Sequence, residues 1–176
     1  WPWNWQPRYV QGGADYYPGS LPETRAVMQF IIGHPNIAGV QTYHNFGGWI
    51  LRGPGVESDA YGGQDIQVYD AIGQVGETSL PGYKYVVIWS GLYTTWGNEL
   101  DWTYAGRGII SYSNELWTPF KYFEKPPERD RYDRPEYQFD RLLLMREAVV
   151  PWTPYSHPQY GQIEVGGVKK QYTRAI

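Results

Sequence analysis

Three side chains of the sequence, His44, Tyr93 and Glu115, have the types from which a metal-assisted site could be built. A histidine nitrogen binds metal ions, and a carboxylate beside a metal-bound water can act as its general base. A tyrosine on a loop flanked by glycines can close over a bound molecule and donate a hydrogen bond to it. The three residues therefore permit metal-assisted acid–base chemistry if the fold brings them together.

Each of these residues also has an ordinary structural explanation. His44 could cap a strand and hydrogen-bond a backbone group, and Glu115 could be a buried structural carboxylate. A catalytic zinc site needs three protein ligands, and none of the three histidines forms a short ligand motif with a carboxylate. His34 and His157, which each precede a proline, are interpreted as structural. The residues alone leave both interpretations of His44 and Glu115 open.

The segment around His44 predicts how that histidine is positioned. Residues 37–43 are rich in β-forming side chains, and His44 stands where this strand should end. Gly47 and Gly48 then allow a turn before the apolar residues 49–51. Because ligands of open α/β sheets bind at the carboxyl ends of strands, this is a favourable position for a metal ligand.

The rest of the chain predicts helices and strands in alternation. One helix is expected to begin within 20–23 and to end within 33–35, and two more helices are expected over 65–75 and 136–149. Strands are expected over 83–89 and 108–116, and a β-hairpin is expected around Gly166–Gly167. Such an alternation favours an α/β sheet with helices on its faces.

The composition bounds the class of protein. The chain has 176 residues, which is about one domain, and it has no cysteine, which excludes disulfides and thiolate ligands. A net charge of −3 without basic runs argues against nucleic-acid binding, and no apolar run is long enough to span a membrane. Nine Trp, 17 Tyr, 21 Gly and 14 Pro favour long structured loops and suit an extracellular or periplasmic hydrolase. The opening WPWNW, without an initiator methionine, is expected to be the interior of a longer chain.

Two stretches of the sequence resemble the zinc carboxypeptidase family. They are GVQTYHNFGGWILRGPG, preceded by SLPETRAVMQFI, and GLYTTWGNELDWTYAGRGIISYSNEL. In these regions the family has a zinc-binding histidine, a loop tyrosine, an Asp-Trp-x-Tyr motif and a strand that ends in the catalytic glutamate. The resemblance covers 1–116. It implies an α/β fold, namely the C-terminal portion of a mixed, mostly parallel sheet flanked by helices.

The resemblance also implies a role for each site residue. His44 would be a zinc ligand, Glu115 the general base, Tyr93 a cover over the bound C-terminal residue, and Asn45 a contact to the substrate backbone. The pocket for the C-terminal side chain would be formed by Leu51, Gly55, Ile88, Leu92, Thr95, Asn98, Glu99, Leu100 and Ser113.

Two of these pocket residues predict different substrates. Leu100 would favour an apolar or aromatic C-terminal residue, whose burial contributes about 1.5–3 kcal/mol. Glu99 would favour lysine or arginine instead if its carboxylate points inward.

The sequence departs from the family pattern in what it lacks. The His-x-x-Glu that supplies two zinc ligands and the arginines that bind the substrate are absent; the family has them ahead of the region that WPWNW resembles. We therefore expect an N-terminal half of the same enzyme as a partner, and no activity for this chain alone. Residues 1–150 are expected to form the C-terminal part of the catalytic domain, and 151–176 the start of a β-rich extension.

The leading hypothesis is a zinc-dependent metallocarboxypeptidase that hydrolyses the C-terminal peptide bond of peptides or proteins. One alternative is a non-catalytic module of the same fold that binds peptide C-termini. Another is an aromatic-rich carbohydrate-binding protein, because tryptophan and tyrosine rings can stack on sugars. Zinc content would separate the enzyme from both alternatives.

Overall fold

The structure is a computed structural model, and it describes residues 1–116 and 140–169. Contacts divide the chain into two compact units, Trp1–Leu116 and Trp117–Ile176. The domain boundary expected at residue 150 stays a prediction.

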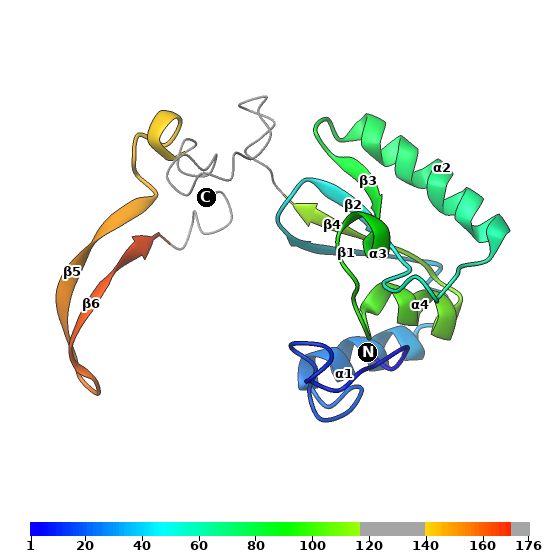
Figure 1. The fold of residues 1–176 in the computed structure, drawn as a ribbon, viewed down its shortest axis with the longest axis horizontal. Helices are drawn as coiled ribbons and strands as arrows, with labels where there is room; N and C mark the ends of the chain where they lie inside the picture. Colours follow the sequence, from blue (N-terminus) through cyan, green and yellow to red (C-terminus); the bar gives the residue numbers. More distant parts are fainter. Residues whose placement is uncertain (117–139, 170–176) are drawn as a thin grey trace. The chain divides into compact units, whose positions relative to one another are not determined.

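A four-stranded sheet forms the centre of the first unit (Figure 1). Its strands lie in the order β1 (Gly39–Asn45), β4 (Ile110–Leu116), β2 (Trp49–Arg52) and β3 (Lys84–Val87). The pairs β1–β4 and β2–β3 are parallel, and β2 runs antiparallel to β4. The sheet is therefore mixed and mostly parallel, with helices packed on it, which confirms the predicted fold class.

One face of the sheet is covered by α2 (Gly63–Ser79), as Figure 1 shows. Tyr69 of this helix is completely buried, and its ring packs against that of Tyr112 in β4. A Cβ at Gly73 would lie 2.4 Å from the ring of Tyr85, so this glycine lets the helix approach the sheet closely.

The other face is covered by α1 (Pro22–Gly33) and α4 (Glu99–Arg107). Ile31 of α1 and Trp102 of α4 form a buried cluster with Ile109, and Val40 of β1 packs against this cluster. No helix within the described residues is long and apolar enough to cross a membrane.

The strand predicted over 83–89 is shorter than expected. It ends at Val87, and a single helical turn, α3 (Ile88–Gly91), follows. The backbone N–H of Trp89 donates to the carbonyl of Pro54 at 3.2 Å, and that of Leu92 donates to Ile88 at 2.9 Å. These bonds replace the sheet ladder, so the apolar pattern predicted the strand correctly and its end wrongly.

In the second unit, β5 (Val149–His157) and β6 (Gly161–Val168) form an antiparallel hairpin. The predicted turn at Gly166–Gly167 is wrong, because both residues lie within β6 and the chain turns at 158–160. A Cβ at Gly166 would lie 2.6 Å from the Cα of Trp152. This glycine therefore permits a close approach of two strands and does not form the turn.

The helix predicted over 136–149 is also wrong for most of its described part. Residues 136–139 lie outside the described residues, and only 140–142 are helical. Met145 and Arg146 have positive φ angles of 52° and 65°, which an α-helix does not allow. The side chain of Asp140 accepts a hydrogen bond from the N–H of Ala148 at 2.8 Å, so this segment forms a compact turn before β5.

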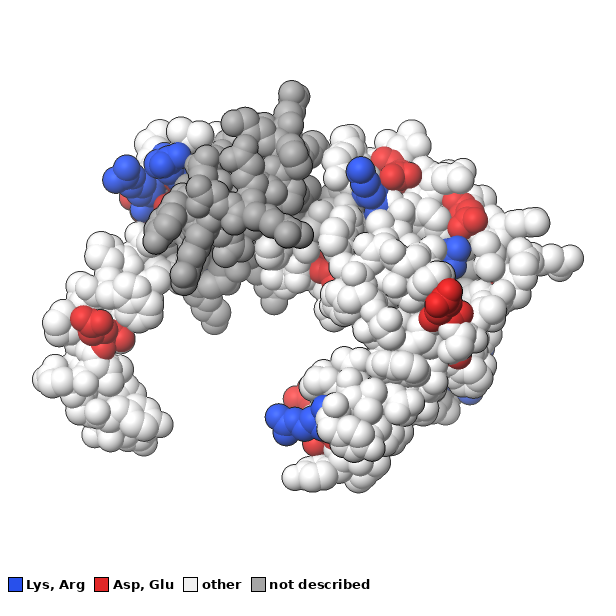
Figure 2. Space-filling view, in the orientation of Figure 1, with Lys and Arg blue, Asp and Glu red and all other residues white. Residues whose placement is uncertain are grey.

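Charged side chains are scattered over the face of the protein that Figure 2 shows, with acidic and basic groups interspersed.

Candidate active site

His44 and Glu115 lie opposite each other at the carboxyl ends of β1 and β4. The parallel register pairs His44 with Glu115, and the antiparallel register pairs Glu115 with Trp49 of β2. Paired residues of neighbouring strands project from the same face of a sheet. The structure therefore brings the predicted histidine and the predicted glutamate together in one row of side chains.

Glu115 is a partly buried carboxylate whose interactions are incomplete. Its Oε2 atom is buried and receives no hydrogen bond from the described residues, and the same is true of the Oγ atom of Ser113. Burial raises the pKa of Glu115, while the nearby His44 opposes this shift. A buried polar atom without a partner costs about 1–3 kcal/mol, so this end of β4 is suited to contact a ligand.

The described residues do not complete a metal site. His44 is exposed, with ring nitrogens of a type that binds metal ions, and Glu115 is placed beside it. However, no three His, Asp or Glu side chains within 1–116 and 140–169 are grouped so that they could hold a metal ion. His44 and Glu115 could therefore contribute to a zinc site, and its further ligands would have to come from outside the described residues.

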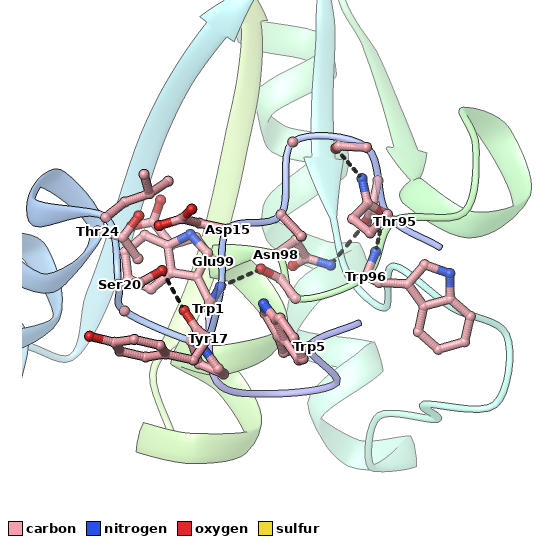
Figure 3. A pocket seen from close by; sticks show the side chains of 18 of the residues that line it. Trp1, Trp5, Asp15, Tyr17, Ser20, Thr24, Thr95, Trp96, Asn98 and Glu99 are labelled. Carbon is pink, nitrogen blue, oxygen red and sulfur yellow. Dashed lines mark hydrogen bonds between the residues drawn. The ribbon is translucent and has the colours of Figure 1, made fainter. Parts of the chain in front are cut away.

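A cavity of about 450 Å³ lies beside His44 (Figure 3). Its walls come from the N-terminal loop, the start of α1, and the segment 95–99 that leads into α4. Two of its lining residues are acidic, Asp15 and Glu99, and four are aromatic: Trp1, Trp5, Tyr17 and Trp96.

Hydrogen bonds fix the loops that form this cavity. The side-chain oxygen of Gln11 accepts a hydrogen bond from the backbone N–H of Trp96 at 2.9 Å. Asp59 accepts hydrogen bonds from Nε1 of Trp3, at 3.1 Å, and from the side-chain amide of Asn4. The N-terminal loop is therefore tied to two later segments, although the sequence shows no helical or strand period there.

A buried carboxylate, Asp101, fixes the start of α4. It accepts hydrogen bonds from the N–H of Gly55 at 2.9 Å, the hydroxyl of Tyr61 at 2.9 Å and Nδ2 of Asn98 at 2.6 Å. Asn98 in turn caps α4, because its Oδ1 accepts the N–H of Asp101 at 2.8 Å. Burial raises the pKa of Asp101, and these hydrogen bonds oppose the shift. The network holds in place the helix end that carries Glu99.

A family model described as zinc carboxypeptidase matches residues 1–136. The chain belongs to the zinc carboxypeptidase family. Among solved structures, carboxypeptidase A from Helicoverpa armigera matches with a TM-score of 0.48 and 22% sequence identity. The match covers 57% of this chain and 26% of that one, so this chain matches about a quarter of the solved structure's length. No curated protein sequence matches the chain.

The residues predicted for the family's side-chain pocket fall into two groups. Leu51, Ile88 and Leu100 form a buried core cluster, and Leu92 packs against it. Ser113 is paired with Leu51 across the sheet and is also buried. None of these residues lines the cavity beside His44.

The second group lies at the cavity. Thr95, Asn98 and Glu99 line it together with His44. Gly55 lies behind this wall, since a Cβ there would be 2.2 Å from Nδ2 of Asn98. Of the two residues that predicted different substrates, Glu99 lines the cavity and Leu100 is 3% exposed in the core.

Two other predicted residues remain outside the cavity. Tyr93 is 62% exposed, lines no part of the cavity and makes no hydrogen bond with a described residue. Asn45 is exposed at the end of β1, directly after His44.

Sequence reasoning missed Asp15, Trp5 and Tyr17. These residues belong to a loop without periodicity, and nothing in the local sequence links them to residues 95–99. In the structure, the hydrogen bonds from Trp1 to the carbonyl of Gly97 and from the N–H of Trp96 to Gln11 reveal this proximity.

Proposed function

We propose that this chain is part of the catalytic domain of a zinc-dependent carboxypeptidase, which hydrolyses the C-terminal peptide bond of peptides or proteins. The observation that carries the proposal is the paired position of His44 and Glu115 at the ends of two parallel strands. Membership of the zinc carboxypeptidase family supports it. The composition supports an extracellular or periplasmic location.

His44 would supply one zinc ligand. The remaining ligands would come from an N-terminal part of the same enzyme that carries the His-x-x-Glu. A zinc ion held there would polarise the scissile carbonyl and make a water molecule more acidic.

Glu115 would act as the general base. It would accept a proton from the attacking water and pass it to the nitrogen of the leaving amine. Burial raises its pKa above the ordinary value of 4.5, towards the range in which a carboxylate exchanges protons readily. The unpartnered Oε2 is an acceptor atom without a competing hydrogen bond from the described residues.

Asn45 and Tyr93 would contact the substrate. Asn45, exposed beside His44, would hydrogen-bond the peptide backbone. Tyr93 would have to move from its exposed position to cover the C-terminal residue, as a tyrosine on a loop can do.

The free edge of β1 supports the proposal of an N-terminal part. Within the described residues, β1 pairs only with β4 and is the outermost strand of the sheet. An unpaired edge of seven residues is prone to join another strand. A strand from the N-terminal part of the domain would satisfy it.

The test combines zinc content and peptide hydrolysis. The protein in its natural length should retain one zinc per chain after dialysis and release the C-terminal residue from a peptide. The variant His44→Ala should lose zinc, and Glu115→Gln should keep zinc and lose turnover. Glu77→Gln, an exposed substitution on α2, should change neither property. Absence of zinc from the natural-length protein would refute the proposal, as would full activity of Glu115→Gln.

A second candidate is a non-catalytic member of the family that binds peptide C-termini. The incomplete set of metal ligands among the described residues favours it. Peptide binding without zinc and without turnover in the natural-length protein would establish this alternative. The carbohydrate-binding alternative has less support, because Trp102 is only 5% exposed and lies in the core.

A further inference from the structure

His157 holds the turn between β5 and β6 through one ring nitrogen (Figure 1). Its Nδ1 atom accepts hydrogen bonds from the backbone N–H groups of Gln159, at 3.1 Å, and Tyr160, at 3.3 Å. Pro158 restricts its own φ angle, and Gly161 follows the turn with a φ angle of 71°. The histidine therefore takes the role that an aspartate or asparagine oxygen has at the start of many turns.

Both hydrogen bonds require an unprotonated Nδ1. A neutral imidazole carries one proton, so the proton of His157 is on Nε2 and the lone pair of Nδ1 faces the two backbone N–H groups. An imidazolium ion has an N–H at both nitrogens and accepts no hydrogen bond. A proton taken up from solvent by Nδ1 would therefore break both bonds and place a third N–H donor against the other two.

The histidine that follows α1 makes the opposite contact. Nδ1 of His34 lies 2.7 Å from the backbone carbonyl oxygen of Phe30, which can only accept a hydrogen bond. His34 therefore donates from Nδ1 and keeps this hydrogen bond when it is protonated. Of these two histidines, His157 is the one whose hydrogen bonds depend on its charge.

No carboxylate among the described residues of the hairpin pairs with His157. Tyr155 of β5 contacts its ring edge-on at a centroid distance of 6.3 Å, and Tyr160 stacks against it at 4.7 Å. The partner of His157 in β6 is Gly161, and Glu164 of β6 projects from the other face of the hairpin because it is paired with the alternate position 154. The ring of Tyr160 would attract an imidazolium ion, and it can do so after both backbone bonds are lost.

The hairpin has few other stabilising contacts among the described residues. In β5 and β6 only His157, Ile163 and Gly167 are half-buried, and the remaining residues are exposed. A two-stranded hairpin without an apolar core is at best marginally stable in water. Loss of the two hydrogen bonds of the turn should therefore also loosen the pairing of the strands.

We propose that His157 makes the β5–β6 hairpin sensitive to pH, with the neutral imidazole holding the turn closed and the imidazolium ion releasing it. The open turn takes up a proton that the closed turn excludes, so acid favours the open form. Histidine side chains change charge between about pH 5 and 8, so the hairpin should be closed above this range and loosened below it. The proposal does not depend on the proposed carboxypeptidase function.

The test follows amide hydrogen exchange by NMR in the 176-residue chain at about pH 7.5 and about pH 5. Protection factors are corrected for the intrinsic pH dependence of exchange. Protection at Gln159 and Tyr160 should fall by about five-fold or more on acidification, and the ladder amides of β6 should lose protection with them. The amide of Ile37, which donates to the carbonyl of His34 at 3.1 Å, should keep its protection and is the internal control.

Two variants assign the effect to His157. His157→Asn retains an acceptor and removes the titration, so it should keep the protection of Gln159 and Tyr160 at both pH values. His157→Leu removes the acceptor, so it should lack this protection at both pH values. The amides of Trp1–Leu116, a separate compact unit, verify that each variant is folded. His157→Asn tests the proposal even if His157→Leu does not fold.

Equal protection of Gln159 and Tyr160 at the two pH values in the unaltered chain would overturn the proposal, and so would the absence of protection at both. An equal loss of protection in His157→Asn would overturn it as well, because another group would then cause the change. Full protection in His157→Leu at the higher pH would have the same consequence. Zinc content and peptide hydrolysis do not enter these measurements, so failure of the carboxypeptidase proposal would leave this one intact.

Discussion

Gly55 and Asn98 are packed so closely that a Cβ at position 55 would lie 2.2 Å from Nδ2 of Asn98. The same Cβ would lie 2.4 Å from Oγ1 of Thr95. Gly55 also donates its N–H to Asp101. The glycine is therefore required by the close approach of the loop after β2 to the start of α4.

The substitution Gly55→Ala should destabilise the protein by about 1–3 kcal/mol, because the added methyl group forces Asn98 and Thr95 to move. Urea denaturation followed by tryptophan fluorescence measures this change. Gly63→Ala is the matched control, since a Cβ at Gly63 meets nothing within 4 Å. Equal stability of the two variants would contradict the packing described for Gly55.

Asp101→Asn should destabilise the protein by about 1–3 kcal/mol, because an amide cannot accept all three hydrogen bonds that the carboxylate receives. Hydrogen exchange should show faster exchange at Gly55 and at the first turn of α4. Asp65→Asn is the control, since this exposed carboxylate accepts only the hydroxyl of Tyr104 among the described residues. Unchanged exchange at Gly55 would show that Asp101 does not position this loop.

Tyr85→Phe should also destabilise the fold, because the hydroxyl of Tyr85 is a hydrogen-bond partner of the buried guanidinium of Arg52. The hydroxyl of Tyr85 accepts a hydrogen bond from Nε of Arg52 at 2.6 Å and donates one to Asp70 at 2.8 Å. Its removal leaves Nε of a residue that is 7% exposed without this partner, at a cost of about 1–3 kcal/mol. Tyr9→Phe, at a side chain that is 90% exposed, should leave the urea midpoint unchanged.

Elements whose hydrophobic pattern agrees with their final packing could be predicted from the sequence. The strand that contains Glu115 has this agreement, since residues 111–113 are buried. The helix that begins at Pro22 was predicted from its first turn, and of its apolar residues Ile31 is buried while Val27 and Phe30 are exposed. The pairing of His44 with Glu115, by contrast, depends on the strand order β1–β4–β2–β3, which local periodicity does not contain.

The prediction from the sequence was wrong where one local sequence pattern is compatible with two different structures. Gly166–Gly167 has the composition of a hairpin turn, but in the structure these glycines allow β6 to pass close to Trp152. The cavity could not be predicted for a related reason. Asp15 and Glu99 line the same cavity because individual hydrogen bonds, such as that between Gln11 and Trp96, hold their segments together. Hydrogen bonds of this kind produce no periodic pattern in the sequence.

Glu115 should make the stability of the protein fall as the pH rises. Burial raises its pKa above the ordinary value of 4.5. Well below that value, the folded and unfolded chains both hold the proton. Between the ordinary and the raised pKa, the unfolded chain has released the proton and the folded chain still holds it. Unfolding then releases a proton, so a higher pH favours unfolding until the raised pKa has been passed.

Other carboxyl groups titrate in the same range, so the measurement compares two proteins. The free energy of unfolding of the unaltered chain and of Glu115→Gln is measured in urea from about pH 4 to pH 7. Their difference isolates residue 115, and Glu115→Gln should gain stability relative to the unaltered chain as the pH rises from about 4.5. Glu77→Gln should give a difference that does not change with pH in this way. A difference for Glu115→Gln that is constant over the range, or that changes with the opposite sign, would mean that burial does not raise the pKa of this carboxyl.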